Sequence, residues 1–287
     1  MPQGERDPVT SRVKAFYEDI TFPNYDGFEG FGDIVRKGLA NAFSSALLNT
    51  IGFNKLVLEV GCGTGQLSHY LQLNNNEVLG VDLSISSLSL AIKHKLENDL
   101  RRSSFVQMDV FDLAIKDASF DAVVCNGVLH HTPNPRSAFT EIVRTVKPGG
   151  LVVLGLYNQF ARIPFKLRSL LFRLVRRQHR DVVSQRSNDP RKASTWIRDQ
   201  YFNPHETLHT LDEVLGWFRE ERIEFVNCMP AVIGTSGEGQ SDPFAPSDTG
   251  NRFLRLVSQF GWIGTIGREG GLFVVVGRKR HVGSADV

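Results

Sequence analysis

The sequence feature that most constrains the fold is LEVGCGTGQ, residues 58–66, where an apolar run ends in Glu59 and continues into closely spaced glycines. Glycines permit a tight turn and let a ligand approach the backbone. The helix expected from Gln66 onward offers free N–H groups to a polar or anionic group. The spacing Gly61-x-Gly63-x-Gly65 departs from the Gly-x-Gly-x-x-Gly of dinucleotide-binding loops. The stretch therefore predicts a nucleotide-type cradle between a strand and a helix.

From residue 55 onward, short apolar runs alternate with segments of helical periodicity. This alternation is typical of a doubly wound parallel sheet, and 287 residues with 41% apolar content can build a substantial core around one. We expect an α/β fold with a doubly wound, mostly parallel seven-stranded sheet. The expected strands are residues 56–60, 77–82, 104–108, 121–126, 151–157, 223–228 and 272–278.

The chain divides into four expected segments. Residues 1–50 read as helices around a turn rich in aromatic residues, Pro and Gly, which predicts an N-terminal helical cap. Residues 51–157 form the cofactor-binding half, and residues 158–209 interrupt the sheet pattern as a helical lid insertion. Residues 210–280 then complete the sheet of the same domain.

Acidic residues follow the second and third expected strands. Asp82 lies seventeen residues after Gly65, where a carboxylate can accept hydrogen bonds from ribose hydroxyls. The alternative is an Asp that caps the next helix. Asp109 is placed to accept from an exocyclic amine of adenine, and Asn126 ends the fourth strand beside the same crevice. These positions predict one ligand crevice at the carboxyl ends of the strands.

On these residues the chain resembles the class I S-adenosylmethionine-dependent methyltransferases over residues 55–157. The motifs in order are Glu59-Val-Gly-Cys-Gly-Thr-Gly65, Val81-Asp82-Leu83-Ser84, Met108-Asp109-Val110, Phe120-Asp121 through Leu129-His130-His131, and Lys147-Pro148-Gly149-Gly150. The resemblance implies S-adenosylmethionine as cofactor, its methionine end on the glycine loop, its ribose on Asp82, and its adenine on Asp109 and Val110. The expected cofactor contacts are Glu59, Gly61, Cys62, Gly63, Gly65, Gln66, Asp82, Leu83, Asp109, Val110, Asn126 and Leu129.

The stretches GVLHH and VKPGG are most similar to the small-molecule, quinone and lipid branch of that superfamily. We therefore expect methyl transfer to a small-molecule or lipid-like acceptor, with O- or C-methylation favoured over N-methylation. The alternative is a tRNA or other macromolecule methyltransferase. The formal net charge of +2 gives no whole-chain signal for nucleic acid, so no DNA partner is expected, whereas an RNA contact stays open. The sequence does not define the oligomeric state.

Three scattered cysteines, early charges at the N-terminus and the absence of an apolar run of eighteen residues suit a cytoplasmic protein. Residues 163–180, IPFKLRSLLFRLVRRQHR, form a basic amphipathic stretch. The pattern favours a helix packed on the sheet with a solvated basic face. A peripheral helix that touches anionic lipid is the second interpretation, and an RNA contact is the third.

A hydroxyl or phenol acceptor would benefit from a general base, and histidine is the usual one. The side chains of adjacent His130 and His131 diverge, so we expect one to face the crevice and the other to pack. Tyr157, at the end of the fifth strand, lies where acceptors are met in open sheets. The candidate catalytic residues are His130, Tyr157, His205 and His209.

The stretch NPHETLHT, residues 203–210, contains His205-Glu206-x-x-His209, which is the H-E-x-x-H pattern of zinc peptidases. Thr210 through Glu213 form a capping box, which predicts a helix start at Thr210 and leaves His209 outside it. Asp212 and Leu215 occupy the positions of the Gly and His that extend the zinc motif. We therefore expect no metal and treat the zinc peptidase as a remote alternative. The stretch is then either an acceptor-site rim, with Glu206 orienting a histidine, or a structural turn.

Overall fold

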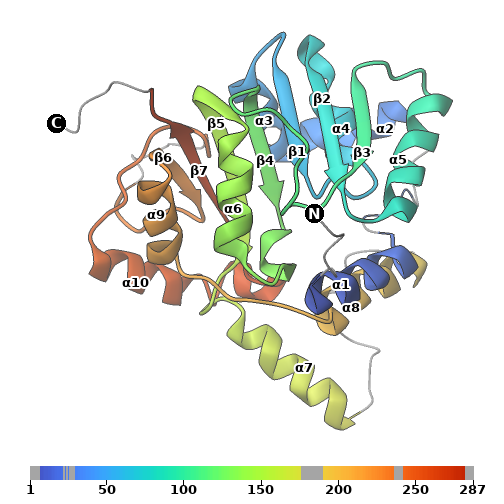
Figure 1. Ribbon diagram of the computed structural model, residues 1–287. Helices are drawn as coiled ribbons and strands as arrows, with labels where there is room; N and C mark the ends of the chain where they lie inside the picture. Colours follow the sequence, from blue (N-terminus) through green and yellow to red (C-terminus); the bar gives the residue numbers. More distant parts are fainter. Residues whose placement is uncertain are drawn as a thin grey trace.

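The computed structural model describes residues 7–21, 23, 25, 30–175, 190–235 and 242–281. Its centre is a seven-stranded sheet of order β3-β2-β1-β4-β5-β7-β6, parallel except for β7 (Figure 1). This confirms the predicted α/β fold. The strands are β1 (Leu56–Val60), β2 (Glu77–Asp82), β3 (Ser103–Gln107), β4 (Phe120–Asn126), β5 (Val146–Tyr157), β6 (Ile223–Met229) and β7 (Leu272–Lys279).

Helices cover both faces of the sheet, because each presents an apolar stripe to it. One face is covered by α2 (Phe31–Ala40), α3 (Ala42–Ile51) and α4 (Gln66–Leu71), whose buried side chains share one core with β1, β2 and β4. The other face is covered by α6 (Pro135–Arg144) and α9 (Leu211–Glu220). In α6, Ala138, Phe139, Ile142 and Val143 are buried, as their spacing predicts. The sheet is therefore sealed between two apolar layers.

Two helices far apart in the sequence meet below the carboxyl ends of the parallel strands (Figure 1). The hydroxyl of Tyr17 in α1 (Pro8–Asp19) donates to Asp199 in α8 (Pro190–Phe202) at 2.8 Å, and Arg198 donates to Asp19 at 2.6 Å. α1 is also fixed to α5 (Ile85–Glu97), because the Glu18 carboxylate accepts from the first backbone N–H groups of that helix. The boundaries of a cap and a lid nevertheless stay predictions.

Helix α7 (Ile163–Val175) projects below the body of the molecule (Figure 1). Phe165 is buried and stacks on Tyr201, but Leu167 and Leu170 are 58% and 57% exposed. This differs from the helix packed on the sheet that the pattern of residues 163–180 favoured, since α7 extends past the sheet edge. The last five residues of that stretch lie outside the described residues. None of the described helices is long and apolar enough to cross a membrane.

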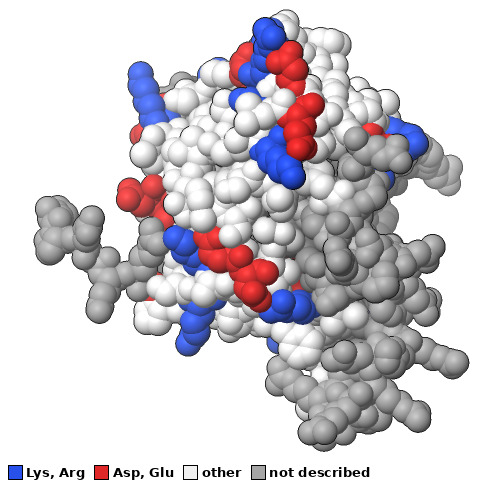
Figure 2. All heavy atoms as spheres, turned by 90° about the vertical axis from the view of Figure 1, so that its right-hand side faces the viewer, with Lys and Arg blue, Asp and Glu red and all other residues white. Residues whose placement is uncertain are grey.

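Acidic and basic side chains are intermixed over the described part of the face that includes α5 (Figure 2). Within α5 and the segments that follow and pair beside it, oppositely charged side chains form ion pairs: Lys93–Glu97, Arg101–Asp99 and Arg102–Glu77. An extended nucleic-acid surface would need basic side chains gathered on one side. The described part of this face does not gather them.

Candidate functional site

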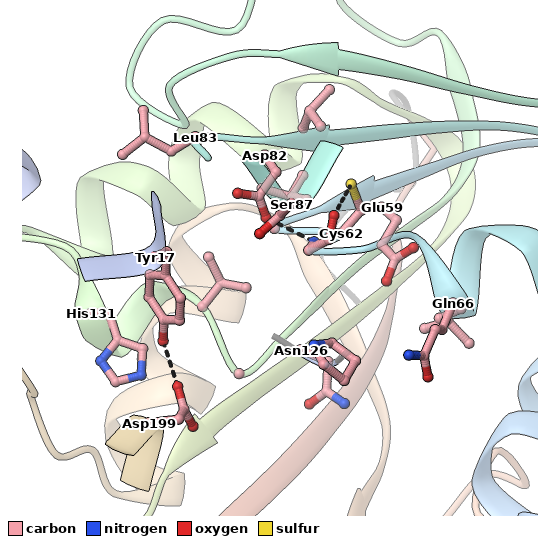
Figure 3. Close-up of a pocket in the computed structure, with 18 of the residues that line it drawn as sticks. Tyr17, Glu59, Cys62, Gln66, Asp82, Leu83, Ser87, Asn126, His131 and Asp199 are labelled. Carbon is pink, nitrogen blue, oxygen red and sulfur yellow. Dashed lines mark hydrogen bonds between the residues drawn. The ribbon is translucent and has the colours of Figure 1, made fainter. Parts of the chain in front are cut away.

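A cavity of about 800 Å³ lies at the carboxyl ends of β1, β2, β4 and β5. The sheet order changes direction between β1 and β4, and open α/β sheets bind their ligands at such a point. Side chains from the glycine loop, the strand ends, α1, α2 and α8 line the cavity, as Figure 3 shows for a set of them. One side holds the motif residues and the other holds aromatic and polar side chains from the flanking helices.

The glycine loop adopts the left-handed backbone that its sequence predicts. Gly61 and Gly65 have φ angles of +71° and +77°, a region that L side chains rarely adopt. A Cβ atom at Gly61 would lie 2.2 Å from a methyl group of Val128, and one at Gly65 would lie 2.6 Å from the ring of Phe105. Backbone conformation and space therefore both require glycine at these positions.

Asp82, at the end of β2, holds the loop in place. One carboxylate oxygen accepts from the backbone N–H of Gly63 at 2.8 Å, and the other accepts from the N–H of Ser84 at 2.8 Å. Burial raises the pKa of Asp82, and these N–H groups oppose the rise. Each carboxylate oxygen can accept a second hydrogen bond, so Asp82 can bind a ligand hydroxyl without releasing the loop.

Glu59, at the end of β1, is the second acidic group of the cavity. Its carboxylate accepts from the Ser68 hydroxyl. Burial raises the pKa of Glu59 to about 8, and the negative charge of Asp82 adds to the rise. Because a nearby cation would favour the carboxylate form, Glu59 can respond to a cationic ligand by losing its proton.

Most of the expected cofactor contacts line this cavity, but two do not. Gly65 lies outside the lining and acts as the N-cap of α4. Leu129 is fully buried in the core, and its neighbour Val128 reaches the cavity instead. The expected contacts that do line it are Glu59, Gly61, Cys62, Gly63, Gln66, Asp82, Leu83, Asp109, Val110 and Asn126.

The other side of the cavity is a chain of side-chain hydrogen bonds. Besides the Tyr17–Asp199 bond, the Gln200 amide donates to the Tyr157 hydroxyl at 2.7 Å and to Asp199 at 3.0 Å. Asn203 donates to the Tyr17 hydroxyl at 3.0 Å. Burial raises the pKa of Tyr17 and of Tyr157, and the charge of Asp199 adds to both rises. Both phenols therefore stay protonated at neutral pH.

The structure corrects the choice between the two adjacent histidines. His130 is fully buried, its ring lies 3.8 Å from the Tyr157 ring, and it is not part of the cavity wall. His131 lines the cavity instead. Both belong to the short turn η2 (Leu129–His131), and their ring centroids lie only 4.2 Å apart, so the two side chains do not diverge as an extended strand would require. The geometry of this turn decides which of the two rings lines the cavity.

The NPHETLHT stretch, residues 203–210, does not bring its histidines into the cavity, as the catalytic interpretations required. His205 and His209 do not line the cavity, and they precede α9, for which Thr210 is the N-cap as predicted. The His205 ring binds the carbonyl of Thr132 at 3.1 Å, and the His209 ring lies between Thr207 and Glu213. A zinc peptidase needs both histidines one turn apart on a single helix. This backbone does not provide that arrangement.

The glutamate of the motif stretch has a structural partner. Glu206 forms an ion pair with Arg162 at 2.5 Å, and the Arg162 side chain is 1% exposed. The guanidinium also stacks over the Tyr157 ring at 3.8 Å and donates to the carbonyl of Gly270 at 2.7 Å. Glu206 thus neutralises a buried cation behind the cavity wall and does not orient a histidine.

The cavity wall contains many residues that the sequence analysis did not name, and four of them form an aromatic and polar set. They come from α1 and α8, and no motif marks them, because amphipathic helices place polar residues at many positions for solubility alone. Only the meeting of the two helices identifies this set: Tyr17, Trp196, Asp199 and Gln200.

The strand order and the glycine cradle beside the carboxylate of Asp82 define the class I S-adenosylmethionine-dependent methyltransferase fold. Comparison with known sequences agrees, since residues 58–154 match a family described as a methyltransferase domain. Residues 58–154 are therefore a methyltransferase domain, and the chain shares the fold of S-adenosylmethionine-dependent methyltransferases.

Three relatives show how far this likeness extends. The chain is 42% identical over 106 residues to a ubiquinone biosynthesis O-methyltransferase of Dechloromonas aromatica, which covers 37% of this chain and 45% of that protein. A protein of the same name from Cronobacter sakazakii is 32% identical over 60% of this chain and 63% of its own length. A solved S-adenosylmethionine-dependent methyltransferase of Methanosarcina mazei has a TM-score of 0.52 at 19% identity, covering 82% of this chain and 97% of that one. The chain thus spans less than two thirds of either curated relative.

Proposed function

We propose that this protein is an S-adenosylmethionine-dependent methyltransferase that methylates a hydroxyl group of a small, uncharged acceptor. The observation that carries the proposal is a cavity shared by two walls: the motif residues form one side, and an aromatic and polar set forms the other. A cofactor-binding module without an acceptor would have no need of the second wall. S-adenosylmethionine supplies an electrophilic methyl group when it is bound.

The residues present fit this cofactor. Asp82 would accept from the ribose hydroxyls and Asp109 from the adenine amine, and Leu83 and Val110 would supply apolar surface for the ring; all four line the cavity. Glu59 would bind the ammonium group of the methionine part, a cation suited to a buried carboxyl whose pKa is raised.

The wall around Asp199 supports an uncharged acceptor. The buried carboxylate of Asp199 would repel an anionic acceptor, and Arg162, which could offset it, lies behind Tyr157 and is neutralised by Glu206. O-methylation is favoured over C-methylation by the name shared by the relatives, ubiquinone biosynthesis O-methyltransferase. A lipid-like acceptor is supported by the exposed leucines of α7, which would help the protein reach an apolar compound in a membrane.

Calorimetry with S-adenosylmethionine, followed by transfer of a labelled methyl group to fractions of metabolites, lipids and RNA, tests the proposal. We expect cofactor binding, and label in the metabolite or lipid fraction. Failure to bind the cofactor would exclude a methyltransferase. Label confined to tRNA would exclude the small-molecule acceptor and support the macromolecule alternative, which the intermixed charges of Figure 2 disfavour.

A further inference from the structure

We infer that His131 is the general base of the reaction, which takes the proton of the acceptor hydroxyl through its Nε2 atom. The inference rests on the proposed function, and it assigns the proton transfer to the one of the two adjacent histidines that lines the cavity. Three observations carry it: the tautomer of the ring, its place in the cavity wall, and the charges around it.

The backbone fixes the tautomer of His131. Its Nδ1 atom lies 2.7 Å from the main-chain carbonyl oxygen of His205. A carbonyl oxygen can only accept, so Nδ1 carries the proton. In a neutral imidazole the lone pair is then on Nε2, and no hydrogen bond to Nε2 occurs among the described residues. His131 therefore presents an acceptor, which is the form a base needs.

The ring is held against the cavity by aromatic neighbours on several sides. The rings of His130, Tyr157 and Tyr17 have their centroids 4.2, 5.8 and 6.2 Å from that of His131. Figure 3 shows His131 beside Tyr17 and Asp199 on one side of the pocket. An acceptor that occupies this side of the cavity would meet His131 while it faces the cofactor.

Charged groups from several elements surround His131. Burial lowers the pKa of His131 below its ordinary value, and Arg162 adds to the lowering, whereas Asp199, the His205 carbonyl and Glu206 oppose it. The ring is therefore neutral at physiological pH and free to accept a proton. Once the proton is transferred, the carboxylates of Asp199 and Glu206 stabilise the imidazolium. His130 is itself held neutral by burial and by the nearby Arg162, so it does not compete for the proton.

The proposed step balances without another reactant. The acceptor oxygen forms the O–CH3 bond with a lone pair, and the S–CH3 bond breaks with its electron pair retained on sulfur. The hydroxyl proton passes to Nε2 of His131, and it leaves to solvent when the products dissociate. Removal of the proton as the bond forms avoids a positively charged oxygen, which is why a hydroxyl acceptor benefits from a base.

This assignment also gives the NPHETLHT stretch a positioning role. Its His205 supplies the carbonyl that orients His131, and the His205 ring binds the carbonyl of Thr132. The backbone N–H of Thr207 donates to the carbonyl of His130 at 2.8 Å. The stretch therefore braces η2, and its His205 acts on the reaction through the placement of His131.

His131→Asn tests the inference, because the asparagine amide can still donate to the His205 carbonyl but offers no basic nitrogen to the acceptor. We expect turnover to fall about 100-fold or more, which is the usual contribution of a general base, with unchanged cofactor affinity in calorimetry. His281→Asn, at an exposed histidine beside Gly149 at the opposite end of the sheet, is the matched control. It should leave both turnover and the shape of the pH–rate profile as in the wild type. A His131→Asn variant with wild-type turnover and pH profile would overturn the assignment.

Phenol and 4-nitrophenol serve as probe acceptors in the same assay. The loss in His131→Asn relative to the wild type should be large with phenol and should shrink to a few-fold with 4-nitrophenol at alkaline pH, because an ionised acceptor needs no base. Repulsion by Asp199 weakens binding of the anion equally in both proteins, so it cancels in this ratio. An equal loss with both would assign His131 a structural role.

A third measurement needs no acceptor. Nitrogen-15 NMR of labelled histidine should find the proton of His131 on Nδ1. A proton on Nε2 would overturn the inference, while loss of cofactor binding by the wild type would instead overturn the proposed function.

Discussion

The cofactor side of the cavity and the acceptor side are built from different kinds of contact. On the cofactor side, Asp82 binds backbone N–H groups within nineteen residues of it, and the glycines are fixed by their own backbone angles. On the acceptor side, the hydrogen bond between Tyr17 and Asp199 joins residues 182 positions apart. The hydrogen bonds from Gln200 to Tyr157 and Asp199 are likewise made between side chains. The first arrangement tolerates little change, whereas the second can vary without disturbing the sheet.

The largest expected effect comes from breaking the cofactor side. Asp82→Ala removes the acceptor for the ribose hydroxyls and releases the backbone of Gly63. Hydrogen bonds to a charged group contribute about 1.5–3 kcal/mol each, so the affinity for S-adenosylmethionine should fall about 100-fold or more. Calorimetry measures it. Asp82→Asn keeps one acceptor oxygen, so its affinity for the cofactor should lie between those of the wild type and Asp82→Ala. Normal cofactor binding by Asp82→Ala would refute the role of Asp82 in holding the ribose.

A smaller effect should follow from breaking the acceptor side alone. Asp199→Asn keeps an acceptor for the Tyr17 hydroxyl but removes the charge. We expect kcat/KM for the acceptor to fall roughly tenfold, the effect of one charged hydrogen bond, because Asp199 both shapes the acceptor side and stabilises the His131 imidazolium; cofactor affinity should stay within about twofold. Steady-state kinetics with each substrate varied in turn separates the two. Equal losses on both sides would mean that the two walls are not independent.

The protonation state of Glu59 gives a separate test of the cofactor side, because Glu59 lies on that side of the cavity and not on the acceptor side. Its pKa of about 8 in the free protein should fall when the cationic cofactor binds, so binding at pH 7 should release close to one proton. Calorimetry in buffers of different ionisation enthalpy counts the protons. Glu59→Gln should release none, and release that persists in this variant would place the proton elsewhere.

The same group predicts how stability depends on pH. Because folding raises the pKa of Glu59 above its ordinary value, the folded protein keeps a proton that the unfolded chain has lost. The free energy of unfolding should therefore fall as pH rises from about 4.5 to 8, by at most roughly 1.4 kcal/mol per pH unit from this group. Thermal melts of the cofactor-free protein, compared with Glu59→Gln, measure the difference. Identical pH dependence in the two would contradict the raised pKa.

The smallest effect concerns the surface near the acceptor side. If α7 contacts anionic lipid, replacing exposed Leu167 and Leu170 by serine should weaken sedimentation with phosphatidylserine vesicles, while turnover of a water-soluble acceptor is unchanged. Leu96→Ser, at an exposed leucine of α5, is the control, and it should leave vesicle binding unchanged. Vesicle binding that does not change would remove α7 from the membrane hypothesis.

Short-range rules were sufficient for the sheet and most of the cofactor side. Strand bounds from apolar runs agree with the structure within a few residues, except at β5, which begins at Val146 where residue 151 was expected. That extra length arises because Val146 pairs with Phe120 before the strand irregularity, a contact between strands that no local pattern marks. Leu129 was misplaced for the same reason, since the turn after β4 decides which of Val128 and Leu129 faces the cavity.

The amino-acid sequence by itself determined the α/β class, the glycine cradle and the carboxylate at the end of β2, because these depend on backbone conformation and on residues close together in the chain. Only the tertiary structure decided that His131 and not His130 reaches the cavity, and that Asp199 meets Tyr17. It also placed the carbonyl of His205, rather than its ring, beside the site. Side-chain direction at a turn and contacts between distant helices follow from packing of the whole chain, which no local pattern records.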